Sequence, residues 1–406
     1  MKVIFLSAMF SDIEADIALS KSNNSVSGHK FQENLIRGIA ENGCDLSVIN
    51  KSRVRTYPNY PKIIMPKKKR MWLDTVPVTD VGFINLSLLS YFTSWVSCYA
   101  ALRKELKKAK NEPCVLVTFN SNLHTCFPML LARALHKNVT LCNVVGDLHG
   151  VYGLQNRAPG LKGLLIRLAE RMQDPVGRKL DSFVFLTEYM AEAMGVAHKP
   201  SCIVEGLYPM QEQEEPVPCE EDENAKIVFY AGTMCKEYGL EHLLRAFSLI
   251  EDANYQLWLA GDGDTAEMIE ECASRDSRIK YLGYITPQQV ARRQAMATVL
   301  ISPRTSELEF VKYSFASKTM ECLASGKPYI AHKLPCDPPE YAQHIQYAAD
   351  DSDEALRDKI MEICSLPKEK REEIGKNARN FIATEKNPKA MCKRIVALWE
   401  SVRKSK

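Results

Sequence analysis

Lys318 and Glu321 lie three residues apart within the segment 313–328, and their types and spacing could hold a nucleotide. If the segment is helical, both side chains share one face. A cation there can bind a phosphate group, and a carboxylate can accept the two hydroxyls of a ribose. The same spacing is common in solvated charge pairs on ordinary helices, and on spacing alone that plain structural interpretation is favoured. The surrounding elements decide between the two.

Those elements predict a strand, a polar loop, a short helix and a second strand. The apolar run 297–303 predicts a buried strand, and Ser314 or Ser317 could cap the helix that follows. Gly326 would end this helix, and Pro328 would block its continuation. In open α/β sheets such a unit places the helix N-terminus against phosphate groups.

A second segment with this character follows the predicted strand 227–230. Gly232 and Thr233 come directly after the strand, and Gly232 would let the backbone approach a phosphate closely. Lys236 precedes a predicted helix at 240–250, so its charge and the helix N-terminus would add positive potential at one place.

The first half of the chain opens with a predicted βαβ unit: a strand at 2–6, a helix at 31–42 and a strand at 46–49. The connection between the first strand and the helix is long and contains Gly28 among small residues. A long loop after a strand either serves function or is a mobile surface loop, and the sequence favours neither.

Three further polar residues follow predicted strands of the first half. Asp147 lies where the strand 139–145 meets its loop, the usual place for active-site groups in such sheets, although it could instead cap the next helix. His124 follows a strand at 114–119, and His149 lies just after Asp147. Both histidines are candidates for contact with a substrate, or loop residues with local hydrogen bonds.

Composition excludes several classes of protein. The chain has 406 residues, with 46% hydrophobic and 25% charged residues and a net charge of +3, which fits a globular protein of two or three domains and gives no reason to expect nucleic-acid binding. Thirteen cysteines without a CxxC pair indicate reduced thiols and a cytoplasmic location. The short apolar run at the N-terminus predicts a strand, not a signal peptide, and no segment is apolar enough to span a bilayer.

Two basic regions, 51–73 and 84–110, include aromatic residues such as Trp72 and Trp95. A basic cluster beside such residues can lie on the cytoplasmic face of an anionic inner membrane. Solvated helix and strand faces account for most charge runs, so this peripheral contact is one of two interpretations.

An acidic, proline-bearing stretch at 209–225 divides the sequence into two halves that each begin with strand, loop and helix. We therefore expect an N-terminal Rossmann-like domain at 1–208, a linker at 209–225, a nucleotide-binding Rossmann-like domain at 226–385, and a C-terminal helix at 386–406.

Four ordered motifs in the second half resemble the GT-B glycosyltransferases, and in particular the large family four of nucleotide-sugar-dependent enzymes. They are Tyr-Ala-Gly-Thr at 230–233, Leu-Ala-Gly-Asp-Gly at 259–263, Tyr-Leu-Gly-Tyr-Ile at 281–285 and Ser-Phe-Ala-Ser-Lys-Thr-Met-Glu at 314–321. The last form is similar to the branch that builds bacterial capsule and exopolysaccharide. The resemblance implies an α/β fold of two Rossmann-like domains facing an interdomain cleft, with the C-terminal helix crossing back to the N-terminal domain.

The resemblance also implies roles for single residues. Glu321 would bind the ribose of the donor, while Lys318 and the backbone of Ser314 and Phe315 would meet its diphosphate or sugar. The backbone of Tyr284 and Ile285 would contact the base, and Gly232 would lie against the phosphates. In the first half, Asp147 and the loop around Gly28 would face the acceptor.

Two departures from the family pattern affect these roles. Tyr313 stands where many relatives carry a second glutamate, and Thr233 stands where many carry an arginine. Lys236 and Arg304 are the nearest substitutes for the missing cation.

The expected activity is metal-independent transfer of a sugar from a UDP- or GDP-sugar to a glycan or lipid-linked acceptor, with retention of configuration and no further cofactor. Lys318, Lys236 and helix N-termini would stabilise the leaving diphosphate, and Asp147 would orient the acceptor or take its proton. A nucleotide-sugar epimerase of similar fold and an inactive nucleotide-sugar-binding subunit are the alternatives.

Overall fold

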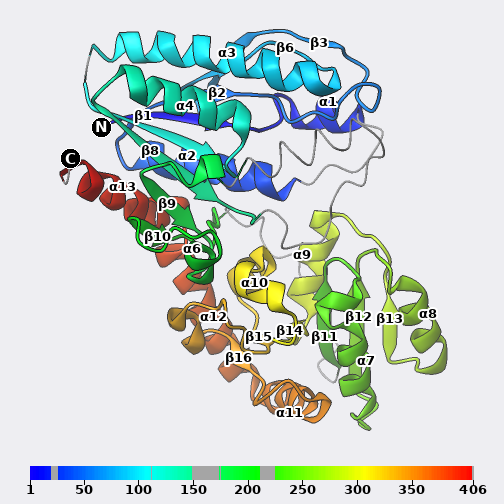
Figure 1. Ribbon diagram of the computed structural model, residues 1–406. Coiled ribbons are helices and arrows are strands. Elements are labelled where there is room, and N and C mark those ends of the chain that lie inside the picture. The colour runs from blue at the N-terminus through cyan, green and yellow to red at the C-terminus, as the bar shows by residue number, and fades with distance from the viewer. Residues whose placement is uncertain (20–25, 111, 149–172, 174, 211–224, 405–406) are drawn as a thin grey trace. The chain divides into compact units, whose positions relative to one another are not determined.

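The computed structural model describes residues 1–19, 26–110, 112–148, 173, 175–210 and 225–404. The chain forms two compact units, one of Met1–Leu207 with Pro388–Lys406 and the other of Tyr208–Asn387. Each unit contains a largely parallel sheet with helices packed against it, which confirms the predicted α/β architecture of two Rossmann-like halves (Figure 1).

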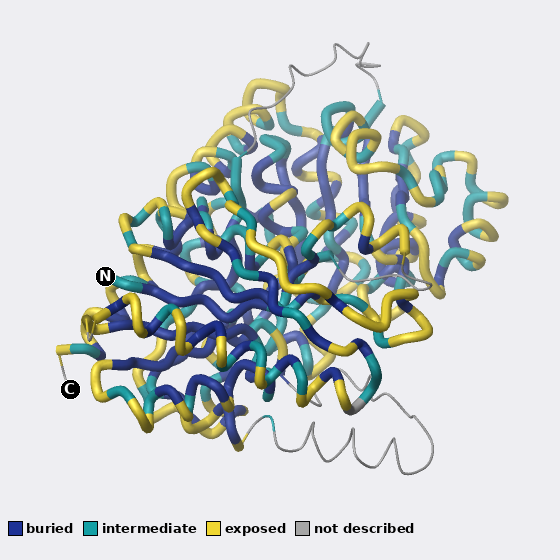
Figure 2. Tube along the Cα trace, turned by 90° about the horizontal axis from the view of Figure 1, so that it is seen from above, coloured by how far each residue is buried: buried dark blue, intermediate teal, exposed yellow. Residues whose placement is uncertain are grey.

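The sheet of the first unit has eight strands in the order β10-β9-β8-β7-β1-β2-β5-β4, and only β4 runs antiparallel to its neighbour. Its strands are β1 (Lys2–Ser7), β2 (Asp45–Asn50), β4 (Lys68–Trp72), β5 (Val76–Asp80), β7 (Cys114–Phe119), β8 (Val139–Val145), β9 (Ser182–Phe185) and β10 (Ser201–Ile203), while β3 (Ile64–Met65) and β6 (Phe83–Ile84) form a separate pair. Its helices are α1 (Ile13–Ala18), α2 (Ser27–Glu41), α3 (Ser87–Lys108), α4 (Leu123–Leu135), α6 (Tyr189–Ala193) and α13 (Pro388–Lys404). The central strands are continuous apolar runs because helices cover both of their faces, and they form the buried interior in Figure 2.

The terminal helix α13 belongs to the first unit, as the predicted crossing requires. It packs on α2, with Met391, Ile395 and Trp399 completely buried. A Cβ atom at Gly38 would lie 2.2 Å from the carbonyl oxygen of Pro388, so this close approach of the two helices requires glycine.

The sheet of the second unit is entirely parallel, in the order β13-β12-β11-β14-β15-β16. Its strands are β11 (Lys226–Ala231), β12 (Tyr255–Ala260), β13 (Ile279–Tyr281), β14 (Val299–Ser302), β15 (Tyr329–Ala331) and β16 (Gln346–Tyr347). Its helices are α7 (Leu240–Ser248), α8 (Ala266–Arg275), α9 (Pro287–Met296), α10 (Ser317–Ala324), α11 (Asp353–Cys364) and α12 (Lys368–Glu385), with 3-10 turns η1 (Lys236–Tyr238), η2 (Glu309–Tyr313) and η3 (Pro339–Gln343). Parallel strands bring all their carboxyl ends to one edge, so the loops after β11, β12, β13 and β14 gather there.

Three local predictions need correction. The helix predicted from residue 31 begins at Ser27, and the supposed loop before it also contains α1. Gly28 marked a loop in the sequence, yet it lies in the first turn of α2, where a Cβ atom would be only 2.7 Å from Arg53 Nη1. Neither Ser314 nor Ser317 caps α10, because Ser317 is its first helical residue and Ala316 holds the cap position without a side-chain hydrogen bond.

None of the helices in the described ranges combines the length and the apolar character that a bilayer crossing would require.

Candidate functional site

The loops at the carboxyl edge of the second sheet are joined by backbone hydrogen bonds. The amide of Gly232 donates to the carbonyl of Ala260 (2.9 Å), and the amide of Gly261 donates to the carbonyl of Gly283 (2.8 Å). Gly261 has a φ of +148°, and a Cβ atom there would lie 1.8 Å from the Gly232 carbonyl oxygen. Glycine is therefore needed for a compact backbone platform at this edge.

Gly232 and Thr233 lie on this platform beside Tyr230. The Tyr230 hydroxyl donates to the Thr233 carbonyl at 2.9 Å, and a Cβ atom on Gly232 would come within 2.9 Å of that hydroxyl oxygen. The small size of Gly232 thus accommodates a tyrosine of the same unit, and the Thr233 carbonyl is already engaged.

Arg304 is the most unusual side chain at this edge. It follows β14 and is only 6% exposed, with its guanidinium 4.8 Å from the Phe310 ring and 5.8 Å from the Tyr238 ring. Its Nη1 donates to the Ser314 carbonyl at 3.4 Å, whereas its buried Nε and Nη2 atoms have no hydrogen-bond partner among the described residues. Leaving buried charged donors unpaired costs about 1–3 kcal/mol or more. An anion would remove that cost.

The carboxylate of Asp337 interacts with Arg304 electrostatically, but it already accepts two hydrogen bonds from other groups. Asp337 accepts hydrogen bonds from the Leu334 amide (3.0 Å) and the Tyr347 hydroxyl (3.0 Å). Burial raises the pKa of the Asp337 carboxyl, and these two hydrogen bonds together with the charge of Arg304 only partly offset this. No ion pair links Arg304 to any residue that the structure describes.

Lys318 and Glu321 share a face of α10, as predicted, with 2.9 Å between Nζ and Oε2. Their side chains are 36% and 45% exposed, so both are free to meet a ligand. Phe315 differs, because its side chain is buried and packs on Tyr341 with 5.3 Å between ring centroids. The Ser314 carbonyl is also engaged, by Arg304.

The segment predicted to contact the base lies between β13 and α9. Tyr284 is 78% exposed and Ile285 is half-buried, directly after Gly283 with its φ of +61°. A capping box of Thr286 and Gln289 fixes the start of α9 and so the end of this segment. An exposed backbone in a fixed position suits contact with the edge of a flat ring.

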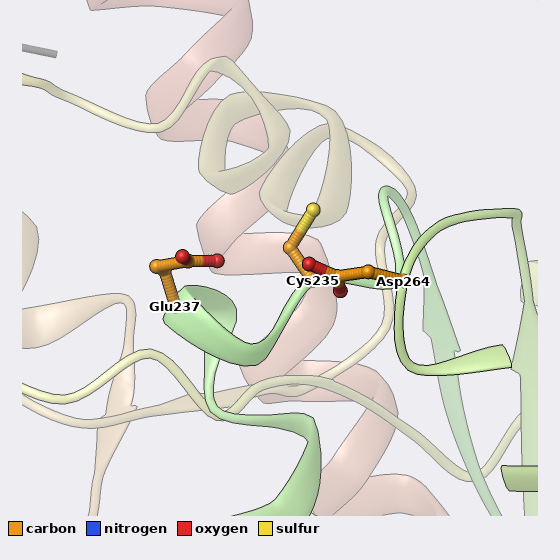
Figure 3. A group of neighbouring side chains, drawn as sticks. All are labelled: Cys235, Glu237 and Asp264. Carbon is orange, nitrogen blue, oxygen red and sulfur yellow. The ribbon is translucent and has the colours of Figure 1, made fainter. Parts of the chain in front are cut away.

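Lys236 lies in a less positive environment than the sequence suggested. Its ammonium is 3.4 Å from Glu241 and its side chain is 71% exposed. Cys235, Glu237 and Asp264 place a thiol and two carboxylates within 4.8 Å of one another beside it (Figure 3). Burial raises the pKa of the Cys235 thiol, which disfavours its thiolate form. This half-exposed group carries no argument for a metal site.

In the first unit, Asp147 lies at the carboxyl edge of the sheet, after β8, and is held by hydrogen bonds with Asn120. Asn120 Nδ2 donates to Asp147 Oδ2 (3.2 Å), and Asn120 Oδ1 accepts from the amides of Gly146 (2.6 Å) and Asp147 (3.2 Å). Asn120 and Ser121 have φ of +59° and +46°, a conformation that non-glycine residues adopt at a cost. The sequence motifs did not single out Asn120. Its position directly after a buried strand, where asparagine tolerates positive φ, was the signal that could have identified it as a site residue.

Arg53 and Gly28 lie near Asn120 and Asp147, and the sequence motifs did not single out Arg53 either. Desolvation lowers the pKa of the Arg53 guanidinium, and the Asp147 charge partly counteracts that shift. His124 lies in the first turn of α4, is 7% exposed, and has a buried Nε2 without a partner in the described residues. Burial lowers its pKa to about 3. His149 lies outside the described residues.

Residues 211–381 match the family described as glycosyl transferases group 1. This match covers most of the second unit, Tyr208–Asn387. No curated protein sequence matches the chain.

Solved structures are similar to the chain over almost its whole length. The sucrose-phosphate synthase from Thermosynechococcus elongatus superposes with a TM-score of 0.60 at 16% identity, over 100% of both chains. HepE from Anabaena in complex with UDP gives 0.61 at 13% identity, over 99% of this chain and 100% of that one. The lipopolysaccharide outer core galactosyltransferase WaaB gives 0.60 at 15% identity, over 99% of each. The chain therefore has the GT-B fold, as its motifs predicted.

Proposed function

We propose that this protein transfers a sugar from a nucleotide-sugar donor to a hydroxyl of a glycan or lipid-linked acceptor. The observation that carries the proposal is Arg304, a buried guanidinium with two unpaired donor atoms at the carboxyl edge of a glycosyl transferases group 1 domain. A diphosphate would supply the missing acceptors and charge. Arg304 would thereby replace the cation that is absent at Thr233.

The rest of the donor would lie along the same edge. Glu321 on α10 would accept the ribose hydroxyls, and Lys318 would approach a phosphate or the donor sugar. The exposed backbone at Tyr284 and Ile285 would meet the base. HepE was solved with UDP and with UDP-glucose, which supports a uridine donor as the first choice for testing.

In the proposed reaction the bond between the anomeric carbon and the diphosphate oxygen breaks, and a bond from that carbon to the acceptor oxygen forms. The acceptor oxygen attacks from the face that the diphosphate leaves, so configuration is retained, and the acceptor proton passes to the departing diphosphate. Arg304 and Lys318 stabilise the negative charge that develops on the leaving group. Asp147, held by Asn120, orients the acceptor hydroxyl.

A thermal-shift screen of UDP-glucose, UDP-galactose, GDP-mannose and ADP-glucose tests donor binding, because a ligand of the native state raises the melting temperature. We expect one nucleotide class to raise it and Arg304→Ala to abolish the shift. Lys318→Ala should abolish turnover with the identified donor. No shift with any nucleotide sugar would contradict the proposal.

The chemical outcome then separates the alternatives. Incubation of the donor alone would reveal an epimerase, because the sugar would be interconverted without an acceptor. Binding without transfer to glycan or lipid-linked acceptors would indicate an inactive subunit, an idea motivated by Tyr313 in place of a glutamate. Transfer to a growing glycan would support a role in capsule or exopolysaccharide synthesis at the cytoplasmic side of the inner membrane.

A further inference from the structure

Two histidines of the second unit form a buried pair. His242 lies in the first turn of α7, and His332 directly follows β15. They are 6% and 1% exposed, and their Nε2 atoms are 2.8 Å apart. Neither residue was a candidate in the sequence. Because both rings are buried, a hydrogen-bond partner is expected for each of their four nitrogen atoms.

The Nδ1 atom of each ring contacts an oxygen atom that can only accept a hydrogen bond. His242 Nδ1 contacts the carboxylate of Asp353, which also accepts from Arg245 at 2.7 and 3.2 Å. Burial acts to raise the pKa of Asp353, but its bonds with Arg245 and His242 outweigh this and lower it, so the carboxyl is ionised. His332 Nδ1 lies 2.9 Å from the carbonyl oxygen of Asp350. Both Nδ1 atoms therefore carry a hydrogen.

The contact between the two Nε2 atoms requires one more proton. Two neutral imidazole rings carry two N–H groups in total, and both are already placed on Nδ1. Without a further proton, two lone pairs would face each other at 2.8 Å. Three protons on two rings give the pair one positive charge. His332 is the neutral member, because burial lowers the pKa of its ring and the charge of His242 lowers it further.

The surrounding groups favour a proton between the rings. The charged groups that face the pair in the described residues are the carboxylates of Asp350, Asp351 and Asp353 and the guanidinium of Arg245. Their excess of negative charge stabilises a cation. A zinc ion fits less well, because two nitrogen ligands of one tetrahedral Zn²⁺ lie about 3.3 Å apart. The observed 2.8 Å is a hydrogen-bond distance.

His332 is linked to the segment that carries Arg304. The carboxylate of Asp351 lies 3.3 Å from His332 Nδ1 through its Oδ1 atom. Its Oδ2 atom accepts hydrogen bonds from the amide (3.0 Å) and the hydroxyl (2.6 Å) of Ser306. Ser306 is two residues beyond Arg304, so Asp351 fixes the chain on the C-terminal side of the guanidinium.

The helix that carries His242 contacts the same segment. At Gly239, directly before α7, a Cβ atom would lie 2.1 Å from the carbonyl oxygen of Pro303. The Tyr238 ring, one residue earlier, is 5.8 Å from the Arg304 guanidinium. The hydrogen bond between the two histidines therefore joins the elements that hold Arg304 in place.

We propose that His242 and His332 share one extra proton and, as a cationic pair, position Arg304 for the diphosphate of the donor. The positioning role rests on the proposed sugar transfer, whereas the proton count rests on geometry alone. Both are positioning residues, because they act through Arg304. A second proton would turn two N–H groups toward each other and break the pair. Donor binding should therefore weaken as the pH falls below about 6.5, the ordinary histidine pKa.

Nitrogen NMR of the full chain labelled with ¹⁵N-histidine tests the proton count. At neutral pH we expect three protonated ring nitrogens in the pair, identified by the signals that change in His242→Gln and His332→Gln. Only two protonated nitrogens would overturn the proposal. Stoichiometric zinc in the purified chain that His332→Leu removes would also overturn it, because a metal would then join the rings.

Calorimetric titration with UDP-glucose and with inorganic pyrophosphate tests the positioning role. His332→Leu leaves His242 Nε2 without its acceptor, and affinity for both should fall about tenfold. His332→Gln offers an oxygen acceptor that takes no second proton. Its affinity should stay within about threefold of the wild type and should not show the acid loss. The matched control is His344→Leu, at a histidine that stacks on Phe381 instead (4.2 Å between ring centroids), and it should match the wild type at each pH.

The melting temperature of each variant shows whether it folds. Ser306→Ala removes one hydrogen bond to Asp351 without touching the rings. It should weaken UDP-glucose binding about twofold and leave the nitrogen spectrum unchanged, which tests the link even if His332→Leu is unfolded. Wild-type affinity and pH profile in His332→Leu would reduce the pair to a core contact and overturn the positioning role. If the wild type binds neither UDP-glucose nor pyrophosphate, the proposed function and the positioning role both fail, and the nitrogen spectrum still decides the proton count.

Discussion

Lys386 and Arg304 are two buried cations of the same unit with similar aromatic neighbours and opposite polar surroundings. Lys386 is 0% exposed and its ammonium lies 4.8 Å from the Tyr341 ring and 5.2 Å from the Phe381 ring. It also donates to Glu340 Oε1 at 2.9 Å. Arg304 has comparable ring contacts but no ion pair in the described residues, and two of its nitrogen atoms are unpaired.

This difference distinguishes Lys386, a structural cation, from Arg304, a cation suited to bind an anion. A buried charge is tolerated when a carboxylate and hydrogen bonds compensate its lost hydration. Lys386 meets that condition within the unit, where it joins the end of α12 to η3. Arg304 does not meet it, and its place at the carboxyl edge of a parallel sheet is where ligands of such folds bind. Removing each side chain should therefore have opposite consequences.

The largest expected effect is on catalysis, in Arg304→Met. The value of kcat/KM for transfer should fall about 100-fold or more, since removing even one neutral donor from an oxyanion-binding site costs about 2.7–4 kcal/mol. The free energy of unfolding should stay the same or rise, because an uncompensated buried charge is removed. Steady-state kinetics and urea denaturation measure the two quantities. A clear loss of stability with normal kinetics would assign Arg304 to the core.

Lys386→Met should show the reverse pattern. We expect the free energy of unfolding to fall by about 3 kcal/mol, the lower end of the range for a broken buried pair, because the remaining Glu340 side chain is 34% exposed and can be hydrated. Donor affinity should change less than about twofold, since Lys386 is not at the proposed site. Adding Glu340→Gln should recover part of the stability. Calorimetric titration with the identified donor completes the comparison.

His124 extends the comparison to the first unit, because it is a buried polar group that avoids charge by staying neutral. Its pKa of about 3 in the folded chain lies below the ordinary 6.5, so between these values the unfolded chain binds a proton that the folded chain does not. Stability should therefore fall as pH drops below about 6.5, by about 2 kcal/mol between pH 7 and pH 5. Urea denaturation at both pH values measures this. His124→Leu should lose most of that dependence; an unchanged pH profile in the variant would refute the assignment.

The smallest effect on stability is expected for Glu321→Gln. The pair with Lys318 is exposed and spans one helical turn, so its loss should change the free energy of unfolding by less than about 0.5 kcal/mol. The donor KM should nevertheless rise severalfold, because an amide accepts the ribose hydroxyls less strongly than a carboxylate. Glu354→Gln, at an exposed position of α11, is the control for a neutralised carboxylate and should leave KM unchanged. Equal KM values for the two variants would remove Glu321 from the donor site.

The sequence alone predicted the architecture and much of the second unit. Continuous apolar runs such as 227–230 and 297–303 identify strands buried on both faces, because such strands need no polar alternation. Gly326 and Pro328 fixed the end of α10, and the spacing of Lys318 and Glu321 fixed their common face, since both depend only on neighbours along the chain. The start of α2 was misplaced, because Gly28 marks a loop in the sequence, whereas in the fold it lies in the first turn of α2 beside Arg53, 25 residues away.

Tertiary structure decided which polar groups are satisfied. Lys236, Lys386 and Arg304 are equally cationic in sequence, yet the fold gives Glu241 to the first, Glu340 to the second and only aromatic rings and a carbonyl to the third. Likewise, Asn120 became important only when its side chain met Gly146 and Asp147 across neighbouring strands. Local sequence determines secondary structure through short-range contacts, whereas the hydration and pairing of a charge depend on residues that only folding brings together.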